Sequence, residues 1–354
     1  MKWILLLSVS IISYNLKAQV PAVFIESSNV LGVSSKNAAL AKAIVDMNGD
    51  FRDDILTMDK DSVYLEIQMN DGQLFKKVFA HPLEKGPFTI NAGDLDNDGL
   101  NDFLHAGFYD DINIFHNQGD FDFAKMPATG ESIFAQGSSL FDINNDGWLD
   151  AVITHDDAAS IVLLNDGQGT LVKEDLIDFT TTPASDNSGN YSAIWVDLNQ
   201  DNLLDMYIAK CRAGVSDPND PRRINMAFIN NDGSFTEMAT DMNLDIGEQS
   251  WCTDSGDLDN DGDMDMVLIN HDAPHMILEN KGDGQFEHHI NFTDRGPFTT
   301  YDLEVAIQDF NNDGWQDILI GGTKDYLLIN EGGLQFKRYD NPFGSKNASA
   351  FGVG

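Results

Sequence analysis

The chain alternates short apolar runs with polar turns, and the pattern recurs about every fifty residues. In the fifth repeat, the four predicted strand segments occupy residues 251–256, 265–270, 276–284 and 285–292, with polar turns rich in Asp, Asn and Gly between them. Runs this short, bounded by turn residues, predict strands rather than helices. Turns such as Asn-Asp-Gly between these runs are hairpin signals. We therefore expect four short antiparallel strands in each repeat.

An acidic segment with fixed spacing separates the first and second runs of each repeat. Residues 257–265 read DLDNDGDMD, with carboxylates at positions 1, 3, 5 and 9 and Gly262 at position 6. Oxygen ligands at alternate positions of a tight loop suit a hard cation such as Ca²⁺, and the carbonyl at position 7 can add a backbone ligand. Glycine allows the turn a positive φ. An EF-hand would need Glu at position 12 and a helix; position 12 is Leu268, in a predicted strand.

Six segments, numbered here as loops 1 to 6, fit this template and begin at residues 46, 94, 142, 197, 257 and 309. A spacing this regular predicts a repeat architecture. The predicted metal-binding residues are Asp46, Asn48, Asp50 and Asp54; Asp94, Asp96, Asp98, Leu100 and Asp102; Asp142, Asn144, Asp146, Trp148 and Asp150; Asp197, Asn199, Asp201, Leu203 and Asp205; Asp257, Asp259, Asp261, Asp263 and Asp265; and Asp309, Asn311, Asp313, Trp315 and Asp317.

Loop 1 departs most from the template, because Phe51 stands at position 6. A bulky residue at positive φ is strained. We expect this loop either to turn differently or to bind a cation poorly. Asn202 in loop 4 is a milder departure, since Asn tolerates the left-handed region.

Four antiparallel strands per repeat predict an all-β fold, a β-propeller of four-stranded blades. Blades packed in a ring bury faces that one blade alone would expose. Residues 347–354 (NASAFGVG) resemble the strand before each acidic loop. We therefore predict seven blades, with the last incomplete in this chain, and residues 21–27 (PAVFIES) as a further strand that closes the ring. The propeller occupies residues 19–354.

The charge balance is strongly acidic, with a formal net charge of −37 and a pI near 4.1 over 354 residues. A nucleic-acid partner is excluded, because phosphate binding needs a basic face. Much of the charge lies in the six loops, where oxygen ligands would repel one another without a metal ion.

The first 18 residues have the pattern of a secretory signal peptide. Lys2 precedes an apolar run at 3–13 that is too short to span a bilayer, and Ala18 precedes the expected cleavage point. We expect a secreted or cell-surface protein without a transmembrane span.

Two cysteines, Cys211 and Cys252, follow and precede neighbouring acidic loops. In an exported protein an even count permits a disulfide. Both residues should lie at the strand ends far from the loops, so a Cys211–Cys252 bridge is one expectation. Two buried thiols are the alternative.

Other chemistry-bearing residues lie outside the acidic loops. Their His-Asp neighbours could bind a metal or transfer protons, but exposed turn residues are the favoured interpretation. These candidates are His105; His155, Asp156 and Asp157; and His271, Asp272 and His275. His288 and His289 adjoin in one strand and should point to opposite faces.

A long loop after the fourth repeat's second strand carries Arg212, Arg222 and Arg223. This basic cluster either contacts an anionic partner or, the favoured interpretation, neutralises nearby aspartates.

The pattern D-x-[DN]-x-D-G-x-x-D after an apolar strand, with N-x-G turns, resembles FG-GAP or VCBS repeats, the blades of integrin-α-like propellers. SWCTDSGDLDNDGDMDMVLIN is similar to the propeller portion of ASPIC/UnbV-type proteins. The resemblance covers about residues 35–354 and implies Ca²⁺ in the loops. We expect a binding or adhesion module with an unidentified protein or glycan ligand. The alternative is a carbohydrate-active enzyme, such as a polysaccharide lyase on a calcium-bearing propeller; no catalytic residue is assigned.

Overall fold

The computed structural model describes residues 42–58, 62–69, 75–82, 86–181, 186–290, 292, 302–322 and 325–342. The predicted signal peptide, the predicted strand at 21–27 and the segment 347–354 lie outside these residues. All the regular secondary structure of the described residues is β-strand, as the short apolar runs predict.

Strands β1 to β12 form the first three four-stranded units, called blades 1 to 3. Blade 1 contains β1 (Lys42–Val45), β2 (Asp54–Met58), β3 (Ser62–Gln68) and β4 (Phe75–Pro82). Blade 2 contains β5 (Pro87–Gly93), β6 (Asp102–Asp110), β7 (Asn113–Asn117) and β8 (Phe123–Lys125). Blade 3 contains β9 (Ile133–Phe141), β10 (Asp150–His155), β11 (Ile161–Asn165) and β12 (Leu171–Glu174).

Strands β13 to β24 form blades 4 to 6 in the same way. Blade 4 contains β13 (Asn190–Val196), β14 (Asp205–Lys210), β15 (Met226–Asn230) and β16 (Phe235–Glu237). Blade 5 contains β17 (Ser250–Gly256), β18 (Asp265–Asn270), β19 (Met276–Asn280) and β20 (Phe286–His289). Blade 6 contains β21 (Asp302–Gln308), β22 (Asp317–Gly322), β23 (Tyr326–Asn330) and β24 (Phe336–Asp340).

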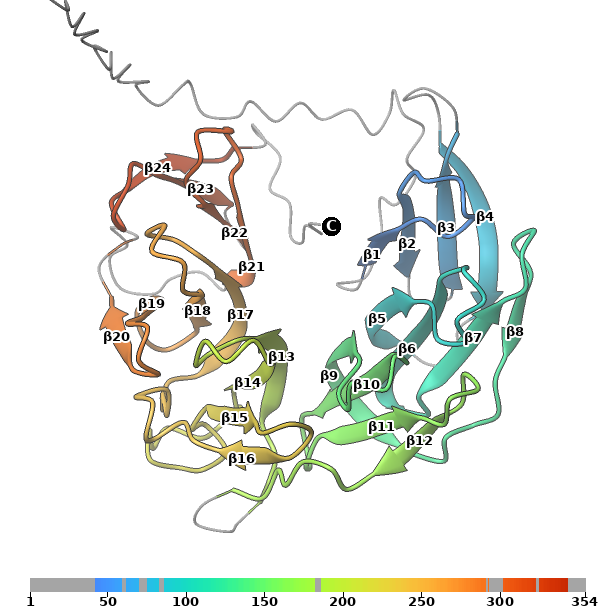
Figure 1. Ribbon diagram of the computed structural model, residues 1–354, viewed down its shortest axis with the longest axis horizontal. Helices are drawn as coiled ribbons and strands as arrows, with labels where there is room; N and C mark the ends of the chain where they lie inside the picture. The colour runs from blue at the N-terminus through green and yellow to red at the C-terminus, as the bar shows by residue number, and fades with distance from the viewer. Residues whose placement is uncertain are drawn as a thin grey trace, which may run out of the picture.

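The blades succeed one another around a ring, from blue blade 1 to red blade 6 (Figure 1). Within each blade, consecutive strands pair antiparallel. Four blades are separate sheets, whereas β6 and β9 also pair and join blades 2 and 3 into one eight-stranded sheet. The first strands of adjacent blades contact each other, so they form the inner wall. The predicted β-propeller is thus confirmed, and the described residues supply six blades. The count of seven stays a prediction.

The hydrophobic core lies between adjacent blades rather than inside any one of them. Leu198 and Tyr207 of blade 4, for example, pack in one cluster with Leu268 and Leu278 of blade 5. Four similar clusters join the other neighbouring pairs among the described blades. This packing follows from strand alternation, because each blade has two apolar faces to bury. The blades therefore hold the acidic loops in a ring at one end of the inner strands.

A sixth cluster lies on the face of blade 6 that points away from blade 5. It contains Ala306, Leu319, Leu327 and Ile329, all buried. Their neighbours Ile318, Ile320 and Leu328 alternate to the opposite face and join the cluster shared with blade 5. A seventh blade would pack on this face.

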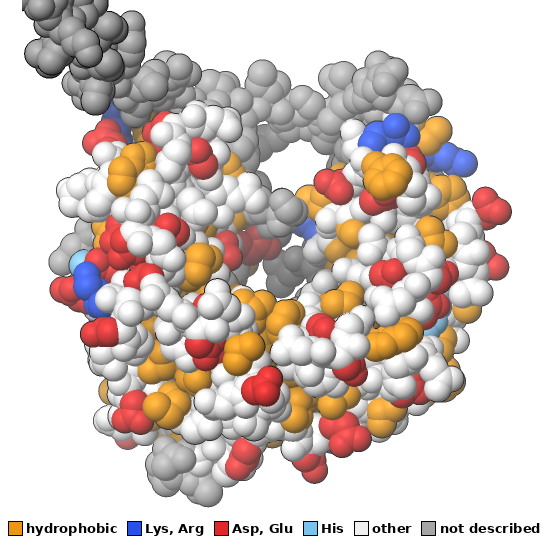
Figure 2. All heavy atoms as spheres, viewed as in Figure 1, with side chains coloured by type: hydrophobic (Ala, Val, Ile, Leu, Met, Phe, Trp, Pro, Cys, Tyr) orange, Lys and Arg blue, Asp and Glu red, His pale blue; other side chains and the backbone are white. Residues whose placement is uncertain are grey.

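Acidic side chains are spread over the face of the ring seen in Figure 2, and basic ones gather in a few places. The same view leaves an opening between the blades at the centre of the ring. Within the described residues, no helix is long and apolar enough to cross a membrane.

Candidate metal centres

Each acidic loop connects the first and second strands of its blade and is shaped by hydrogen bonds to its own carboxylates. In loop 5, the N–H groups of Asp261 and Gly262 donate to the two carboxylate oxygens of Asp257, each at 3.1 Å. The equivalent pair of bonds to position 1 is present in all six loops. The backbone thus curls around the first carboxylate in every loop.

The same turn places the side chains of positions 3 and 5 beside position 1. The Asp261 N–H also lies 3.2 Å from Asp259 Oδ1, and the Asp263 N–H donates to Asp261 Oδ1 at 3.0 Å. Carboxylate oxygens of Asp257, Asp259 and Asp265 come within 4.8 Å of one another. In loop 2 the same is true of Asp94, Asp96 and Asp98. The structure therefore brings together side chains that the spacing selects.

The loop backbone is left-handed at two positions, 4 and 6, of which the sequence pattern identified only the second. Position 6 has positive φ throughout, including Gly262 (φ 99) and Asn202 (φ 66). Position 4 also has positive φ, as in Asn97 (φ 57) and Asn260 (φ 59). Asn is the non-glycine residue that adopts this region most readily. Asn at position 4 in most of the loops was the signal that could have revealed this.

Loop 1 turns in the same way as the others despite Phe51. The residue has φ 63, its N–H donates to Asp46 Oδ2 at 2.6 Å, and its side chain is 97% exposed. The expectation that this loop could turn differently is therefore wrong; the loop accepts the strain. Arg52 Nη2 lies 2.5 Å from Asp50 Oδ2, so a guanidinium already neutralises one carboxylate here.

The aspartate at position 9 is the first residue of the second strand and is fully buried in every loop. Asp54, Asp102, Asp150, Asp205, Asp265 and Asp317 have this place. In loop 5, Asp265 accepts the N–H of Leu258 at 2.9 Å and that of Asn280 at 2.9 Å. Burial raises the pKa of Asp265 to about 7, and neighbouring carboxylates add to the effect. Burial also raises the pKa of Asp102, Asp150, Asp205 and Asp317 to about 6.

Crowding also affects carboxylates at positions 3 and 7 of loop 5. Burial and then the nearby charge of Asp261 raise the pKa of Asp259 to about 6. Asp263 has a raised pKa because of burial and the neighbouring Asp261, Asp257 and Asp197. Asp197 belongs to loop 4, so negative charge accumulates between loops as well as within them. A bound cation would relieve both effects.

In four of the described blades, an asparagine at the end of the third strand connects the blade to the acidic loop of the preceding blade. The Asn165 side-chain amide of blade 3 donates to the carbonyl of Leu95 in loop 2 at 2.8 Å. The equivalent bonds are Asn117 to Met47 at 2.8 Å, Asn280 to Leu198 at 3.2 Å and Asn330 to Leu258 at 2.7 Å. The sequence analysis missed this role, although an Asn at that point of the later repeats was the visible signal.

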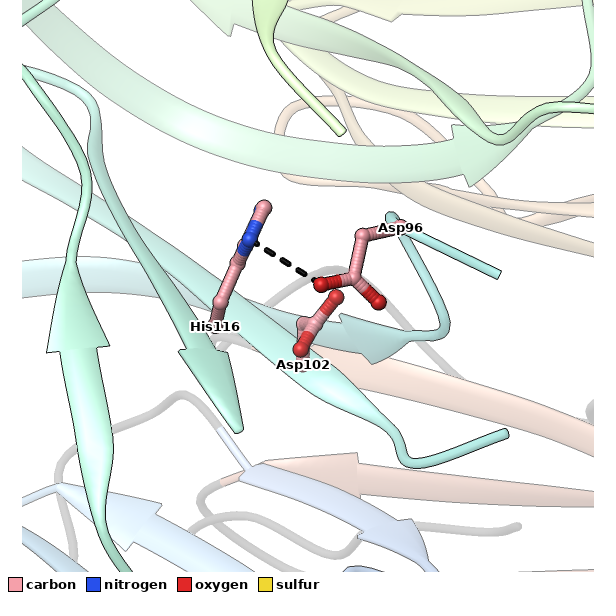
Figure 3. Close-up of side chains that lie close together, drawn as sticks. All are labelled: Asp96, Asp102 and His116. Carbon is pink, nitrogen blue, oxygen red and sulfur yellow. Dashed lines mark ion pairs between the residues drawn. The ribbon is translucent and has the colours of Figure 1, made fainter. Parts of the chain in front are cut away.

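Loop 2 has a further donor beside it. Asp96, Asp102 and His116 point toward one another (Figure 3), and one ligand atom of each lies within 4.8 Å of the others. His116 Nδ1 is 3.3 Å from Asp96 Oδ2, and Nε2 is 2.9 Å from the carbonyl of Gly169 in blade 3. Gly169 has φ +83, and a Cβ there would fall 2.7 Å from both Asp96 and His116. The His116 imidazole therefore packs in the contact between loop 2 and blade 3.

The two cysteines are free thiols, so the expected Cys211–Cys252 disulfide is wrong; of the two buried thiols in the alternative, Cys211 is buried and Cys252 is half-buried. Cys252 lies on β17 and packs in the cluster shared with blade 6. Cys211 directly follows β14 and its N–H bonds to Gly189 at the start of blade 4. The two side chains thus face different neighbours. Burial raises the pKa of the Cys211 thiol to about 12 and that of Cys252 as well.

The interpretation of the histidine and aspartate candidates as exposed turn residues is wrong for His155, Asp156 and His275, which are buried, and holds for Asp272, which is exposed in the turn after β18. His155, Asp156 and His275 are 8%, 8% and 2% exposed. His275 Nε2 lies 2.8 Å from Asp302 Oδ2, and its Nδ1 accepts the Asn270 N–H. These contacts connect blades 5 and 6, whereas His155 belongs to blade 3, so the two clusters are separate.

The remaining predicted histidines also have structural contacts. His105 on β6 is buried and its ring lies parallel to Phe115. His288 Nε2 is 2.6 Å from the Asn243 carbonyl, and His289 Nε2 is 2.6 Å from Glu279 Oε2. The two neighbours reach different partners, which confirms their opposite orientation.

The three arginines of the cluster form ion pairs with neighbouring aspartates, as the favoured interpretation predicted. Arg212 pairs with Asp156 at 3.0 Å and with Asp157 at 2.7 Å, bridging blades 3 and 4. The other two pairs are Arg222 with Asp220 at 2.7 Å and Arg223 with Asp272 at 2.6 Å. The loop therefore fastens the face opposite the acidic loops.

Comparison with protein families matches the FG-GAP-like repeat at residues 46–105, 94–153, 142–208 and 257–320. Each matched repeat begins at position 1 of an acidic loop and runs into the strand after the next one, so all six loops lie within the matches. No curated protein matches the chain.

Among solved structures, one similar chain is an Agrocybe aegerita lectin described as recognising non-reducing terminal N-acetylglucosamine. It is 20% identical with a TM-score of 0.59, over 88% of this chain and 81% of that one. Another is BBS1N in complex with ARL6DN, 11% identical with a TM-score of 0.56, over 94% and 90%. A third is Saccharomyces cerevisiae Sqt1, 8% identical with a TM-score of 0.57, over 86% and 75%. At these identities the likeness shows the fold.

Proposed function

Since this chain belongs to the proteins built from FG-GAP-like repeats, we propose that it is an exported binding module whose acidic loops hold Ca²⁺ as structural ions. The observation that carries the proposal is the convergence of carboxylate oxygens within 4.8 Å in loops 2 and 5. Hard oxygen donors on a flexible turn are what Ca²⁺ takes. Among the described residues, no Lys or Arg forms an ion pair with a carboxylate of loops 2 to 6.

The residues that would hold the ion are those at positions 1, 3, 5 and 9, with the carbonyl at position 7. A bound divalent cation would supply positive charge to the carboxylates of loops 2 to 6, with which no described Lys or Arg forms an ion pair. In loop 5, two backbone N–H groups of the loop donate to the carboxylate at position 1, Asp257. The carboxylate at position 9, Asp265, accepts one N–H from the loop and one from the third strand. Ligand orientation is thus set by the fold before any ion arrives, which lowers the cost of ordering them.

Ion binding in a loop would also act on the contact between blades. The position 2 carbonyl accepts the asparagine of the next blade, as Leu95 does from Asn165. Fixing the loop therefore fixes this bond, and the proposed calcium ions would strengthen the cohesion of the ring.

The decisive experiment is thermal unfolding in Ca²⁺ and in excess chelator, with isothermal titration calorimetry of the chelated protein. A ligand that binds only the folded state raises the melting temperature by mass action. We expect chelator to lower the melting temperature and Ca²⁺ to restore it, with Mg²⁺ much less effective. An unchanged melting curve would refute structural calcium.

The kind of ligand is proposed from the propeller architecture. Its structural neighbours include a lectin described as recognising a terminal sugar and a chain in complex with a protein, ARL6DN. We therefore propose a protein or glycan ligand for this module.

Export is proposed from the pattern of residues 1–18. N-terminal sequencing of the protein recovered from the medium or cell envelope should begin at Gln19. A mature chain that still begins at Met1 inside the cell would contradict export.

A further inference from the structure

The inner strands of five consecutive blades share one irregularity near their first residues. Each pairs with the second strand of its blade through a β-bulge that leaves one residue unpaired. These five residues are Phe88, Gln136, Tyr191, Trp251 and Leu303. A bulge redirects a side chain and commonly does so next to a binding site.

All five bulged residues line the same cavity of about 220 Å³. The cavity lies at the starts of β5, β13, β17 and β21 and beside the middle of β9, and these inner strands surround the centre of the ring (Figure 1). The acidic loops follow the last residues of these strands, so they lie beyond the strand ends that are far from the bulges. Ser138, Ser192 and Glu304 add polar groups to its wall.

Contacts outside the cavity hold its aromatic and amide side chains in place. Asp156 Oδ2 accepts Gln136 Nε2 at 3.1 Å and the Tyr191 hydroxyl at 3.4 Å. Asp156 is itself paired with Arg212.

Trp251 is fixed by its ring neighbours. Its indole lies 4.7 Å from the Tyr191 ring and stacks at 4.4 Å on His271. The wall is therefore ordered before a ligand arrives, which favours binding.

We propose that this cavity binds a neutral saccharide ring. The aromatic side chains Phe88, Tyr191 and Trp251 offer apolar surfaces to the C–H face of a sugar, and the Gln136 amide and serine hydroxyls suit its hydroxyl groups. The volume fits one ring rather than an extended chain. The inference rests on the proposed function and assigns that binding module its ligand class and site.

The charges around the cavity disfavour the other ligand classes. Arg212, the nearby guanidinium, is occupied by Asp156 and Asp157, and the chain carries a net charge of −37, so an anion is repelled. The Glu304 carboxylate interacts with the Lys42 ammonium, which partly balances its charge, so the ligand need not be positively charged. One face of the Trp251 indole is covered by His271, which leaves an incomplete cage for an organic cation.

The test is calorimetric titration of the calcium-loaded full chain with glucose, galactose, mannose and N-acetylglucosamine, and with choline as an organic cation. We expect at least one saccharide to bind with one site per chain. Trp251→Ala and Gln136→Ala should each weaken that binding about tenfold or more. Tyr339→Ala, on the outer strand β24, is the matched aromatic control and should leave it unchanged.

Three results would overturn the assignment: no saccharide binding, binding that survives both cavity variants, or binding of choline in place of sugars. Melting curves establish that each variant is folded, and Gln136→Ala keeps the test valid if Trp251→Ala fails to fold. The melting curve of the unmodified protein with and without chelator is read separately. A calcium effect without saccharide binding refutes only this inference, whereas an absent calcium effect refutes the proposed structural ions.

Discussion

The side-chain amide of Asn165 donates to the backbone carbonyl of Leu95, 70 residues earlier, at 2.8 Å. It also donates to the Leu149 carbonyl of its own blade at 3.1 Å, and the Asn165 side chain is buried. One side chain thus connects the acidic loop of blade 2 to the acidic loop of blade 3. Such hydrogen bonds fix the position of one blade relative to the next.

Asn165→Ala should therefore destabilise the protein more than the same change at Asn230. Asn230 donates to Leu204 within its own blade at 3.2 Å, and it makes no such bond to the preceding loop among the described residues. A buried hydrogen bond is worth about 1 kcal/mol, and an orphaned carbonyl costs more. We expect Asn165→Ala to lower the free energy of unfolding by about 1 kcal/mol beyond Asn230→Ala in denaturant titrations. Equal losses would contradict the role of the inter-blade bond.

Asp261→Ala should remove one calcium site without loss of the fold. Asp261 is exposed in loop 5, and its carboxylate accepts the Asp263 N–H. Mass spectrometry under native conditions, or calorimetry, should show about one fewer bound ion per chain, and circular dichroism should be unchanged. Release of most of the calcium by this one substitution would show that the loops do not act as independent sites.

Phe51→Gly should stabilise loop 1. Phe51 adopts φ 63 while its side chain is 97% exposed, so the change relieves backbone strain and removes almost no packing. A left-handed conformation costs an ordinary residue about 1–2 kcal/mol, and the added chain entropy of glycine offsets about 0.5–1 kcal/mol of that. We expect a net gain of about 0.5–1 kcal/mol in the free energy of unfolding.

Asn202→Gly is the matched control, at the same position of loop 4 with φ 66. Asn tolerates this region, so its replacement should change stability less. A larger gain at Asn202 than at Phe51 would mean that strain at position 6 does not limit loop 1.

Loop 1 should also bind calcium more weakly than the others. Arg52 places a guanidinium 2.5 Å from Asp50, which a metal ion would have to displace or tolerate. Arg52→Ser should therefore raise the affinity of the weakest site seen by calorimetry. An unchanged weakest site would assign the weak step to another loop.

Because of Lys210, we expect the free energy of unfolding to rise with pH between about 8 and 10.5. The side chain is fully buried at the end of β14, and its ammonium donates to the Ser188 carbonyl and to Asn190 Oδ1, each at 3.0 Å. Burial lowers its pKa from 10.5 to about 8. Between pH 8 and pH 10.5, the Lys210 side chain keeps its proton in the unfolded chain but has released it in the folded chain. The free energy of unfolding therefore rises with pH across this window, and this gain is lost as the pH falls to about 8.

Lys210→Met should remove this part of the pH dependence, which amounts to about 3–4 kcal/mol at about 1.4 kcal/mol per pKa unit. Denaturant titrations at several pH values above neutral measure it. Lys173→Met is the control, because Lys173 forms an exposed ion pair with Glu131. A pH slope that persists in Lys210→Met, or that disappears in Lys173→Met, would assign the effect to other groups.

The local features of this protein could be predicted from its sequence because they depend on neighbours in the chain. The short apolar run DMVLIN, bounded by turn residues, predicted the strand β18 at Asp265–Asn270. The 1-3-5-9 spacing identified carboxylates that converge in loop 5, since a nine-residue turn can bring its own side chains together whatever the rest of the fold does. The repetition of these units then predicted blades, because one blade cannot bury both its faces.

The tertiary structure alone decided which residues meet across blades. Five bulges direct Phe88, Gln136, Tyr191, Trp251 and Leu303 into one cavity, and no local pattern marks a bulge. The two cysteines also stay free thiols, with Cys252 packed in the cluster shared by blades 5 and 6. Such contacts join residues about fifty or more positions apart, and their geometry is set by how whole sheets pack rather than by the preferences of any one segment.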